Sequence, residues 1–542
     1  MKKKVKLANI PDLNTVKEII LYGTEKGKDH KQFIFHDKKR VEHTKTFNMT
    51  WKDISGIAQY LYDNGITDKK KIAFLSENSY EWIVGYYAVM VSGNVAVPLD
   101  SKLGAEDLAK QLINCHCDAI FYETEFSDVL EDIYKVEGMH KMQEFNFDNF
   151  SEYYEKGLES IAKGNTQGVD AEVKGEDMAC IVYTSGTTGR SKGVMLSHKN
   201  LTSDAVASCR VLSGRHAIGF LPLNHTYSWV SALFSCYLLT EYGYICQSIK
   251  NIQGDMMKYN PYNFSGVPLA VETIYDRIWK TAKKQGREEI LQKGIKISRL
   301  LMKFGIDRRR KLFKTVHDNL GGNLNMIICG GAALDPKHEQ FFYDIGILII
   351  NGYGTTECSP AVTCNRQDNF KFGSVGLPLP CCEVKINEPN EEGVGEIYVR
   401  GENVMMGYYD DPEATASVFD GEWFKTGDFG RMDEDGFLYY VGRKKNLIVT
   451  KGGKNVSPEE LEDKLVRFDY VKEVLVYEEN DIIVGEFYLD TAEYPDAEEQ
   501  LKKDMKEFNA KTPSFKKIGK IVVRDTEFPK TTTLKIRRKY NN

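Results

Sequence analysis

The sequence lacks several features that would place it in a specialised class of protein. Its 542 residues carry a formal net charge of only −6, so no strong field of one sign draws it toward nucleic acid. It has 11 cysteines but no C-x-x-C pair, and Cys115-His116-Cys117 and Cys381-Cys382 are spaced too tightly for the common zinc sites. We therefore expect reduced, buried thiols in a cytoplasmic protein rather than a disulfide framework or a zinc site.

A secretory leader and a membrane-spanning segment are also missing from the pattern. The N-terminal "MKKKVKLANI" is basic, but no long apolar run follows it. The longest uncharged run, Trp82 to Leu99, is broken by Ser92-Gly93-Asn94 and has Pro98 near its end. These breaks predict a buried helix, a turn and a short buried strand. We expect a cytoplasmic protein, with peripheral contact to a membrane left open.

The sequence pattern is typical of an α/β protein with more than one domain. Hydrophobic residues make up 42% and charged residues 28%, and a chain of this length exceeds one core. Between about residues 71 and 122, short apolar runs alternate with helical stretches, which predicts a parallel sheet covered by helices. After about residue 375 the pattern becomes alternating strands, which predicts a small antiparallel sheet or barrel. Ser457-Pro458 then opens a helix of a last α+β unit.

We therefore predict an α/β fold with two domains. The large N-terminal domain covers residues 1–442 and contains layered parallel sheets with helices, plus the small barrel-like subdomain. The C-terminal α+β domain covers residues 443–542.

One stretch has the composition of a phosphate-binding loop. "YTSGTTGRSKGVMLSH" follows a buried strand and precedes a predicted helix. Glycines let backbone N–H groups approach an anion, hydroxyls add donors and Lys192 adds charge. A Walker A loop would need a second glycine five residues after Gly186, where Ser191 stands instead. The alternative is a flexible Gly/Ser/Thr loop without a ligand.

The same stretch resembles the phosphate-loop signature of the adenylate-forming superfamily, which contains acyl-CoA synthetases, luciferases and the adenylation domains of peptide synthetases. Six further blocks follow in the family order and extend the resemblance over essentially the whole chain: "LPLNHTYSW", "GGAAL", "NGYGTTE", "WFKTGDFG", "YVGRKKNLIVTKGGKNVSPEELE" and "FPKTTTLKIRR". The resemblance implies a two-step reaction. A carboxylate attacks the α-phosphorus of ATP to give acyl-AMP and pyrophosphate, and a thiol then attacks the acyl carbon and releases AMP.

The resemblance also implies which residues bind the nucleotide. Tyr353 would stack on the adenine, Gly331 and Ala332 would flank it, and Asp428 and Arg443 would contact the ribose. The remaining nucleotide-binding positions are Thr184, Ser185, Gly186, Thr187, Thr188, Gly189, Lys192, Asn351, Gly352, Gly354, Thr355, Thr356 and Lys535. Glu357, with Thr184, would bind Mg²⁺.

Three positions near the C-terminus carry the expected domain movement. Lys535 resembles the lysine that the small domain brings to the adenylation site, although Leu534 stands where the family usually has glycine. Lys445 occupies the hinge position of the family. Gly453 matches the glycine of the loop used for thioester formation. The resemblance therefore implies a mobile C-terminal domain, with Lys535 joining Thr184, Lys192, His225 and Glu357 as the catalytic set. For Lys535 the alternative is a merely basic tail.

The motifs indicate less directly which carboxylic acid is activated and which thiol accepts the acyl group. "LPLNHTYSW" lacks the aspartate with which peptide-synthetase domains hold an amino group, so an amino acid substrate is disfavoured. His225 matches the histidine near the carboxylate, and Trp229 resembles the gate tryptophan of some long-chain enzymes; the alternative for each is a core residue. We predict an acid–thiol ligase that activates a medium- or long-chain fatty acid with ATP, Mg²⁺ and coenzyme A.

Alternatives remain for the acceptor and for the class of function. An acyl carrier protein can replace coenzyme A, and a non-catalytic nucleotide-binding homologue would be expected to lose Lys192, Glu357, Asp428 or Lys535, all of which are present. An enzyme that cleaves ATP at the γ-phosphate would need a Walker A loop or the set of protein-kinase motifs, and neither is found in the sequence.

The stretch from Lys280 to Asp318 is strongly basic, with 13 Lys/Arg and only four Asp/Glu. This basic 280–314 segment is either a solvated helical face or a contact for an anionic membrane or acidic partner.

Overall fold

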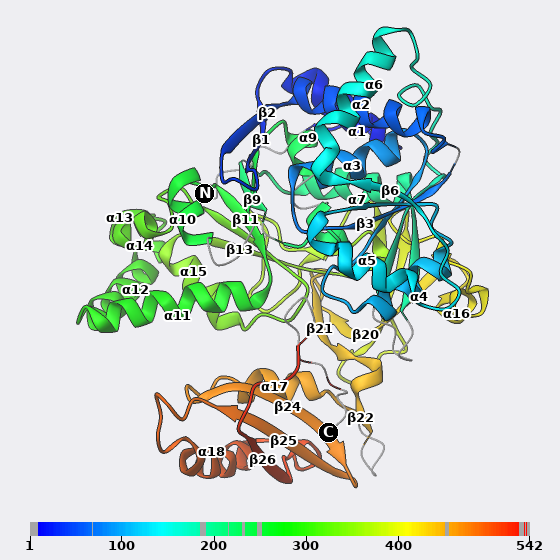
Figure 1. Cartoon of the computed structure of the whole chain (residues 1–542). Helices are drawn as coiled ribbons and strands as arrows, with labels where there is room; N and C mark the ends of the chain where they lie inside the picture. Colours follow the sequence, from blue (N-terminus) through cyan, green and yellow to red (C-terminus); the bar gives the residue numbers. More distant parts are fainter. Residues whose placement is uncertain are drawn as a thin grey trace. The chain divides into compact units, whose positions relative to one another are not determined.

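The computed structural model describes residues 9–67, 69–184, 191–214, 216–219, 221–229, 234–246, 252–449, 455–530, 536 and 538. The chain folds into two compact units (Figure 1). The first contains residues 1–383 and 399–424, and the second contains residues 384–398 and 425–542. The α/β class predicted from the sequence is confirmed, since parallel sheets dominate the first unit. The boundary at residues 442 and 443 stays a prediction.

The first unit contains a seven-stranded sheet at whose edge the predicted phosphate loop lies. Its strand order is β18 (Gly407–Tyr408), β8 (Lys192–Ser197), β7 (Met178–Thr184), β4 (Val95–Pro98), β3 (Lys71–Leu75), β5 (Ala119–Tyr122) and β6 (Gln143–Asn146). The pairs among β3 to β7 are parallel, whereas β8 is antiparallel to both of its neighbours. The predicted helix, turn and strand after Trp82 appear here as α3 (Tyr80–Val91) and β4.

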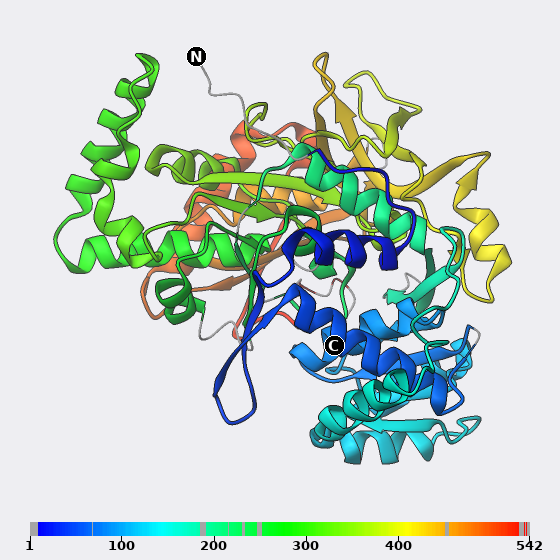
Figure 2. The same cartoon turned by 90° about the horizontal axis from the view of Figure 1, so that it is seen from above.

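Helices cover this sheet, as the alternating pattern predicted. They are α2 (Phe47–Asp63), α3, α4 (Ala105–Cys115), α5 (Ser127–Tyr134) and α6 (Phe150–Ala162), coloured blue and cyan in Figure 2. The inner strands and α3 are almost continuously apolar because both of their sides are buried. α3 begins where the Ser79 side chain accepts a hydrogen bond from the Trp82 amide. The uncharged run therefore belongs to a buried layer of this unit.

A nine-stranded sheet forms the second layer of the first unit. Its order is β15 (Leu377–Pro378), β14 (Ala361–Cys364), β13 (Leu348–Gly354), β12 (Met326–Cys329), β11 (Asn263–Gly266), β9 (Ala217–Gly219), β10 (Gly243–Ile245), β1 (Lys31–His36) and β2 (Glu42–Thr46). The central pairs are parallel, so the loops after β11, β12 and β13 leave the sheet at one edge. Two of the predicted nucleotide loops, after β12 and β13, are therefore neighbours.

Helix α7 (His198–Val211) joins the two layers because it follows β8 in the chain but packs on the nine-stranded sheet. Ala207 and Val211 of α7 lie in one apolar cluster with Met326 of β12 and Ile350 of β13. Further helices of the unit are α1 (Val16–Gly27), α9 (Ser235–Leu239), α10 (Ile252–Tyr259), α11 (Pro268–Lys284), α12 (Glu288–Lys303), α13 (Arg309–Leu312), α14 (Lys314–Asn319), α15 (Pro336–Ile345) and α16 (Pro412–Ser417).

The curled sheet predicted after residue 375 is also present. Its order is β16 (Cys382–Asn387), β17 (Gly395–Gly401), β20 (Trp423–Met432) and β19 (Phe419–Asp420), with β21 (Leu438–Arg443) paired to β20. Residues 384–398 and 425–443 of this sheet belong to the second unit.

The rest of the second unit is the compact α+β fold that the sequence predicts. A short pair, β22 (Ile448–Val449) and β23 (Asn455–Val456), leads to a three-stranded sheet of β24 (Val471–Glu479), β25 (Ile482–Leu489) and β26 (Lys520–Arg524). Helices α17 (Pro458–Leu465) and α18 (Ala497–Lys511) supply Leu461 and Leu501 to its core. The Ser457 side chain accepts a hydrogen bond from the Glu460 amide, which confirms the predicted helix start.

Helix α15 carries a buried carboxyl group with an unusual protonation behaviour. Glu339 is 1% exposed, and the Gly373 amide donates a hydrogen bond to its Oε2 at 2.6 Å. Burial raises the pKa of Glu339 from 4.5 to about 7, although the hydrogen bond from Gly373 opposes the rise. Between these two pKa values the folded chain keeps a proton that the unfolded chain releases, so this group stabilises the fold below pH 4.5 and loses that contribution as the pH rises through 7.

We expect Glu339→Gln to remove this pH dependence. Glutamine resembles the protonated form and still accepts the bond from Gly373, so the wild type should lose ~3 kcal/mol of stability relative to the variant between about pH 4.5 and 8. Thermal unfolding followed at several pH values measures the difference. The exposed Glu413→Gln variant should keep the wild-type slope. Parallel slopes for Glu339→Gln and wild type would contradict the assignment.

No helix among the described ranges is long and apolar enough to cross a bilayer. Within the same ranges, no group of three or more His, Cys, Asp or Glu side chains is arranged to hold a metal ion.

Candidate active site

The predicted phosphate loop is the turn of a β-hairpin. Thr184, the last residue of β7, pairs with Lys192, the first residue of β8. The loop positions Ser185, Gly186, Thr187, Thr188 and Gly189 lie outside the described residues. The helix predicted to follow this stretch is confirmed as α7, which begins at His198, but the strand β8 before it was not predicted: "KGVMLS" pairs with both β7 and β18. The loop therefore connects two antiparallel strands, and α7 follows the second of them.

A tyrosine connects this hairpin to the loop after β13. The hydroxyl group of Tyr408 donates a hydrogen bond to Oε1 of Glu357 at 3.0 Å, and the Lys192 ammonium lies 4.6 Å from the centroid of the Tyr408 ring. Thr355 also donates its hydroxyl hydrogen to Oε2 of Glu357. The structure thus brings Lys192, Thr355 and Glu357 together through Tyr408, which sequence reasoning missed because "GYYDD" contains no catalytic pattern.

The surroundings of Glu357 fit a magnesium ligand. Both carboxylate oxygens accept hydrogen bonds from neutral hydroxyl groups, and no Lys or Arg nitrogen of the described chain lies within 4.0 Å of them. The negative charge is oriented without being neutralised by an ion pair. Mg²⁺ takes one or two protein carboxylates and completes its shell with phosphate and water, so a single carboxylate suffices. Glu357 would hold the ion, and Thr184 remains the second predicted ligand.

We expect Tyr408→Phe to weaken this arrangement without destroying it. The phenyl ring keeps the aromatic face for Lys192, but Glu357 loses one donor to a charged acceptor, which corresponds to roughly a tenfold loss of activity. The Mg²⁺ concentration for half-maximal activity should rise as well. Tyr409→Phe is the matched control, since Tyr409 lies beside Lys71. An unchanged Mg²⁺ dependence in Tyr408→Phe would contradict the role of the hydroxyl group.

A pocket of about 1160 Å³, which includes space open to solvent, begins at the loops after β12 and β13. The predicted nucleotide residues on its wall are Gly331, Gly352, Tyr353, Gly354, Thr355 and Thr356. Gly354 also has a structural reason to be glycine, because a Cβ there would lie 2.0 Å from the carbonyl oxygen of Pro360. His225 lines the same pocket, and the Tyr227 amide donates a weak hydrogen bond to its Nδ1 at 3.4 Å.

The pocket continues as an apolar cavity between α7 and the nine-stranded sheet. Cys209 comes from α7 and Leu212 follows it, while Met326, Ile328 and Ile350 come from β12 and β13. These wall residues were not predicted, because no local motif distinguishes them from ordinary core residues. The arrangement places one polar mouth, with hydroxyl groups, glycines and a histidine, at the end of an apolar chamber.

Several predicted residues do not line this pocket, and Trp229, Asn351 and Ala332 are among them. Trp229 is fully buried in the core, where its ring packs 4.8 Å from that of Tyr86 and its Nε1–H donates to the Leu223 carbonyl oxygen at 2.6 Å. Its role as a gate stays a prediction, and it would require the indole to leave this position. Asn351 is buried beneath the sheet surface, and Ala332 is exposed beside Gly331.

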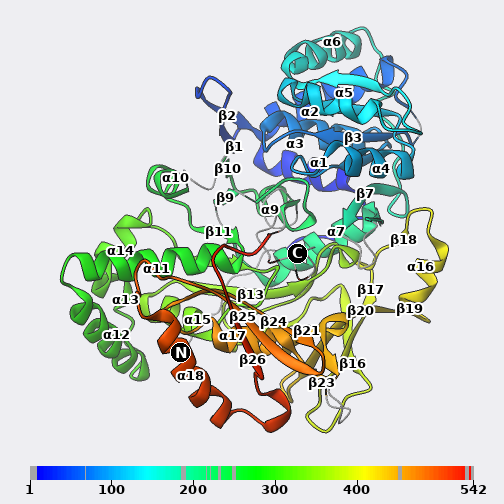
Figure 3. The ribbon, with the colours of Figure 1, turned by 60° about the horizontal axis from the view of Figure 1, so that its bottom comes forward.

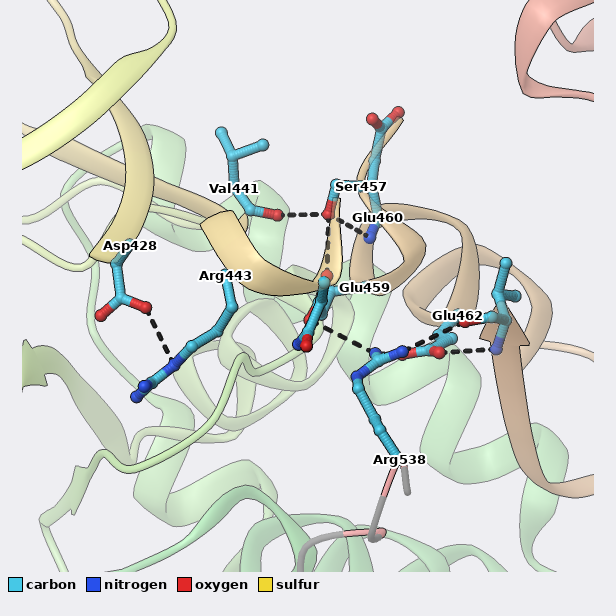
Figure 4. Close-up of polar contacts among 10 residues, drawn as sticks. Asp428, Val441, Arg443, Ser457, Glu459, Glu460, Glu462 and Arg538 are labelled. Atoms are coloured by element: carbon cyan, nitrogen blue, oxygen red, sulfur yellow. Dashed lines mark hydrogen bonds and ion pairs between the residues drawn. The ribbon is translucent and has the colours of Figure 1, made fainter. Parts of the chain in front are cut away.

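The second unit carries the residues predicted to contact ribose. Asp428 of β20 pairs in register with Arg443 of β21, and Nε of Arg443 lies 3.0 Å from Oδ1 of Asp428 (Figure 4). Asp428 is only 2% exposed, so its carboxylate is held in one orientation. Lys445, the predicted hinge, is exposed on the short 3₁₀ turn Lys444–Asn446 that follows. Its role as a hinge stays a prediction.

The same unit anchors the chain end that bears the predicted adenylation lysine. Arg538 lies 3.3 Å from Oε1 of Glu459, forms an ion pair with Glu462 and donates to the Val476 carbonyl oxygen at 3.1 Å (Figure 4). Asn446, beside the hinge position, donates to the same Glu459 oxygen at 2.6 Å. Lys535 and Gly453 themselves lie outside the described residues.

Comparisons with known proteins show that the chain is similar to AMP-binding enzymes over most of its length. The family model of AMP-binding enzymes matches residues 24–409. A long-chain-fatty-acid–CoA ligase of Mycobacterium bovis is 29% identical over 445 residues, which are 78% of this chain and 73% of that protein.

Two solved structures share the fold. O-succinylbenzoate coenzyme A synthetase of Bacillus subtilis, in complex with ATP and magnesium, has a TM-score of 0.73 at 22% identity and covers 96% of this chain and 98% of its own. The anthranilate CoA ligase AuaEII, in complex with anthranoyl-AMP, has a TM-score of 0.78 at 20% identity, with coverages of 98% and 97%. The region that the family model matches contains the β7–β8 hairpin, the loops after β12 and β13, and Tyr408. The resemblance predicted from the ordered sequence blocks is confirmed: the chain belongs to the AMP-binding enzyme family.

Proposed function

We propose that the protein is an acid–thiol ligase that activates a medium- or long-chain fatty acid with ATP and transfers the acyl group to coenzyme A. The observation that carries the proposal is the pocket in which Tyr353, Thr355 and Thr356 form one end and Leu212, Met326 and Ile350 line the other. A polar mouth of this kind suits a carboxylate beside a nucleotide, and the apolar chamber suits an alkyl chain. The relative from Mycobacterium bovis, named a long-chain-fatty-acid–CoA ligase, supports the same substrate class.

In the first step, a carboxylate oxygen of the acid attacks the α-phosphorus of ATP, the bond to the bridging oxygen breaks and pyrophosphate leaves. The attacking carboxylate and the leaving pyrophosphate are both anionic. The residues with the largest effect on this step are therefore those that carry positive charge or hold a positive charge in place. Lys192 binds the phosphates from the hairpin, Lys535 assists from the second unit, and His225 orients the carboxylate. Mg²⁺, when bound at Glu357, supplies additional charge neutralisation on the phosphate oxygens.

In the second step, the thiol sulfur of coenzyme A attacks the acyl carbon, its proton passes to solvent and AMP leaves with the former carboxylate oxygen. The family carries out this step after its small domain has turned, which places the hinge at Lys445 and the thiol-step loop at Gly453. Closure around the acyl-adenylate keeps water from hydrolysing it. Asp428 and Arg443 hold the ribose, and Tyr353 stacks on the adenine.

The acid is not defined by the fold, since the structural relatives are named for o-succinylbenzoate and anthranilate. The test is a pyrophosphate-release screen across fatty acids of increasing chain length and across aryl acids, with coenzyme A or an acyl carrier protein as the acceptor. We expect acid-dependent formation of AMP and pyrophosphate that is strongest for alkyl chains. Preference for the carrier protein would change the acceptor, and preference for aryl acids would overturn the fatty acid. ADP as the product would exclude adenylation.

A further inference from the structure

The basic segment of residues 280–314 folds into the end of α11, the whole of α12 and α13, and the start of α14. These helices lie together at one edge of the first unit, where α12 is remote from the blue and cyan layer (Figure 3). α11 begins two residues after β11, and Asn263 of β11 lines the pocket. Helix α11 therefore connects the segment to a strand that contributes to the wall of the proposed acyl site.

Helix α12 has two apolar faces, and only one is covered. Leu291 and Ser298 face the protein and are buried, and the Ser298 hydroxyl donates to the Asp344 carbonyl oxygen of α15. Four other apolar residues form a stripe at helical spacing that faces solvent: Ile290 is 66% exposed, Ile297 48%, Leu300 56% and Phe304 72%. Large apolar side chains exposed in a row are unusual for a monomer surface and mark a contact region.

Positive charge beside this stripe is only partly compensated by the chain itself, since Lys293 forms an ion pair with Glu289 of the same helix. Lys293, Lys296 and Lys303 project from the solvent-facing half of α12. Eight basic side chains of the segment make no ion pair with any described carboxylate, although Arg310 donates to backbone carbonyl oxygens: Lys283, Lys284, Arg287, Lys296, Lys303, Arg308, Arg310 and Lys311. By contrast, Arg299 pairs with Asp344 and has a structural role. The excess charge is therefore available to an external anion.

We propose that this face of α12, with its flanking lysines and arginines, docks the protein on the surface of an anionic lipid bilayer. A helix whose apolar residues are flanked by lysines lies in the plane of the interface, with the apolar residues among the acyl chains and the ammonium groups at the phosphates. Anionic lipids attract such clusters, and the attraction falls with salt. Docking would hold the protein at the phase into which long-chain acids partition, a benefit that rests on the proposed function.

Two other occupants would satisfy part of these observations. An acidic protein would complement the charge, but it would leave Phe304 and Ile297 without a reason to be exposed. A second copy of the chain would cover the apolar stripe, but it would bring two basic segments together. Only an anionic bilayer satisfies both the stripe and the charge.

The test uses the full-length protein and vesicles of phosphatidylcholine with about 30% phosphatidylglycerol, in a co-sedimentation assay. Binding should weaken at least fivefold from low to high salt and be absent with neutral phosphatidylcholine vesicles. Lys296→Glu/Lys303→Glu and Ile297→Ser/Phe304→Ser should each weaken binding at least fivefold. Matched controls elsewhere in the first unit are Lys39→Glu/Lys163→Glu and Val41→Ser/Met257→Ser, which alter exposed side chains and should bind like the wild type.

Insertion is tested separately with Phe304→Trp. Its difference fluorescence against the wild type should shift to shorter wavelength with anionic vesicles and stay unchanged with neutral ones. Salt-sensitive vesicle binding without this shift would mean that the apolar stripe does not enter the bilayer, and it would overturn the proposal. A concentration-dependent dimer that Ile297→Ser/Phe304→Ser abolishes would overturn it in favour of self-association. Vesicle binding requires no ligase activity, so a failure here leaves the proposed reaction intact.

Discussion

Replacing Lys535 with alanine is expected to reduce acyl-adenylate formation by ~10²–10³-fold while thioester formation from supplied acyl-AMP stays near the wild-type rate. In the first half-reaction, negative charge is spread over phosphate oxygens, and a fixed cation at this position has its largest effect there. In the second half-reaction AMP leaves as an anion, but under the proposed domain movement Lys535 has then moved away from the phosphate and contributes little. The two half-reactions are measured separately, by pyrophosphate release and by consumption of synthetic acyl-AMP.

The neighbours of Lys535 argue against a merely basic tail. Ile536 forms a β-bridge with Lys530, and Arg538 is held by Glu459, Glu462 and the Val476 carbonyl oxygen. Ile536 and Arg538, which follow Lys535, are thus held on the second unit, as expected for a lysine that is used in one domain arrangement. Because Glu459 also accepts from Asn446, the same carboxylate contacts the predicted hinge segment.

Two variants complete this experiment. Gly453→Leu should show the reverse pattern, with pyrophosphate release preserved and thioester formation reduced, because a side chain there would obstruct the thiol path. Lys506→Ala removes an exposed lysine of α18 and should leave both steps unchanged. If Lys535→Ala slowed both half-reactions equally, the assignment of Lys535 to one domain arrangement would be wrong.

Substituting glutamine for Glu357 should have an effect of similar size on the first half-reaction. The amide keeps the shape of the side chain and still accepts from Tyr408, but it carries no charge for Mg²⁺. We expect a loss of ~10²–10³-fold in adenylation that added Mg²⁺ only partly restores. Pyrophosphate release measured over a range of Mg²⁺ concentrations gives both values.

The control for this variant is Glu413→Gln, an exposed position in α16 that follows Tyr408 in the chain. It should retain the wild-type rate and Mg²⁺ dependence. Wild-type behaviour of Glu357→Gln at every Mg²⁺ concentration would move the metal site away from Glu357. Since Tyr408→Phe is predicted to act through the same carboxylate, combining it with Glu357→Gln should cost less than the two separate losses together.

Much of the fold could be predicted because its elements carry strong local signals. α3 and β4 follow from an uncharged run broken at Ser92-Gly93-Asn94, and α17 follows from Ser457 and Pro458. The strand-then-loop pattern around Gly331 and Tyr353 located two loops that the parallel pairing of β12 and β13 does bring to one edge. Backbone periodicity and turn residues determine such features, so one sequence suffices for them.

The remaining features depend on contacts between distant segments. β8 was missed because its six residues form a strand only by pairing with β7 and β18, the latter more than 200 residues away. Tyr408 has no local pattern and gains its meaning from Glu357 and Lys192. The acyl chamber combines α7 with β12 and β13, so no single stretch predicts its wall. Trp229 stands at a motif position and is buried in the core in this structure, so its role as a gate stays a prediction.

The central claim is that the acid is activated by attack of its own carboxylate oxygen on the α-phosphorus of ATP. It is tested most directly with a fatty acid labelled with ¹⁸O in both carboxylate oxygens, in the presence of coenzyme A. The account predicts that the AMP released carries one labelled oxygen in its phosphate, while the pyrophosphate carries none. Label in inorganic phosphate together with ADP, or AMP without label, would contradict it.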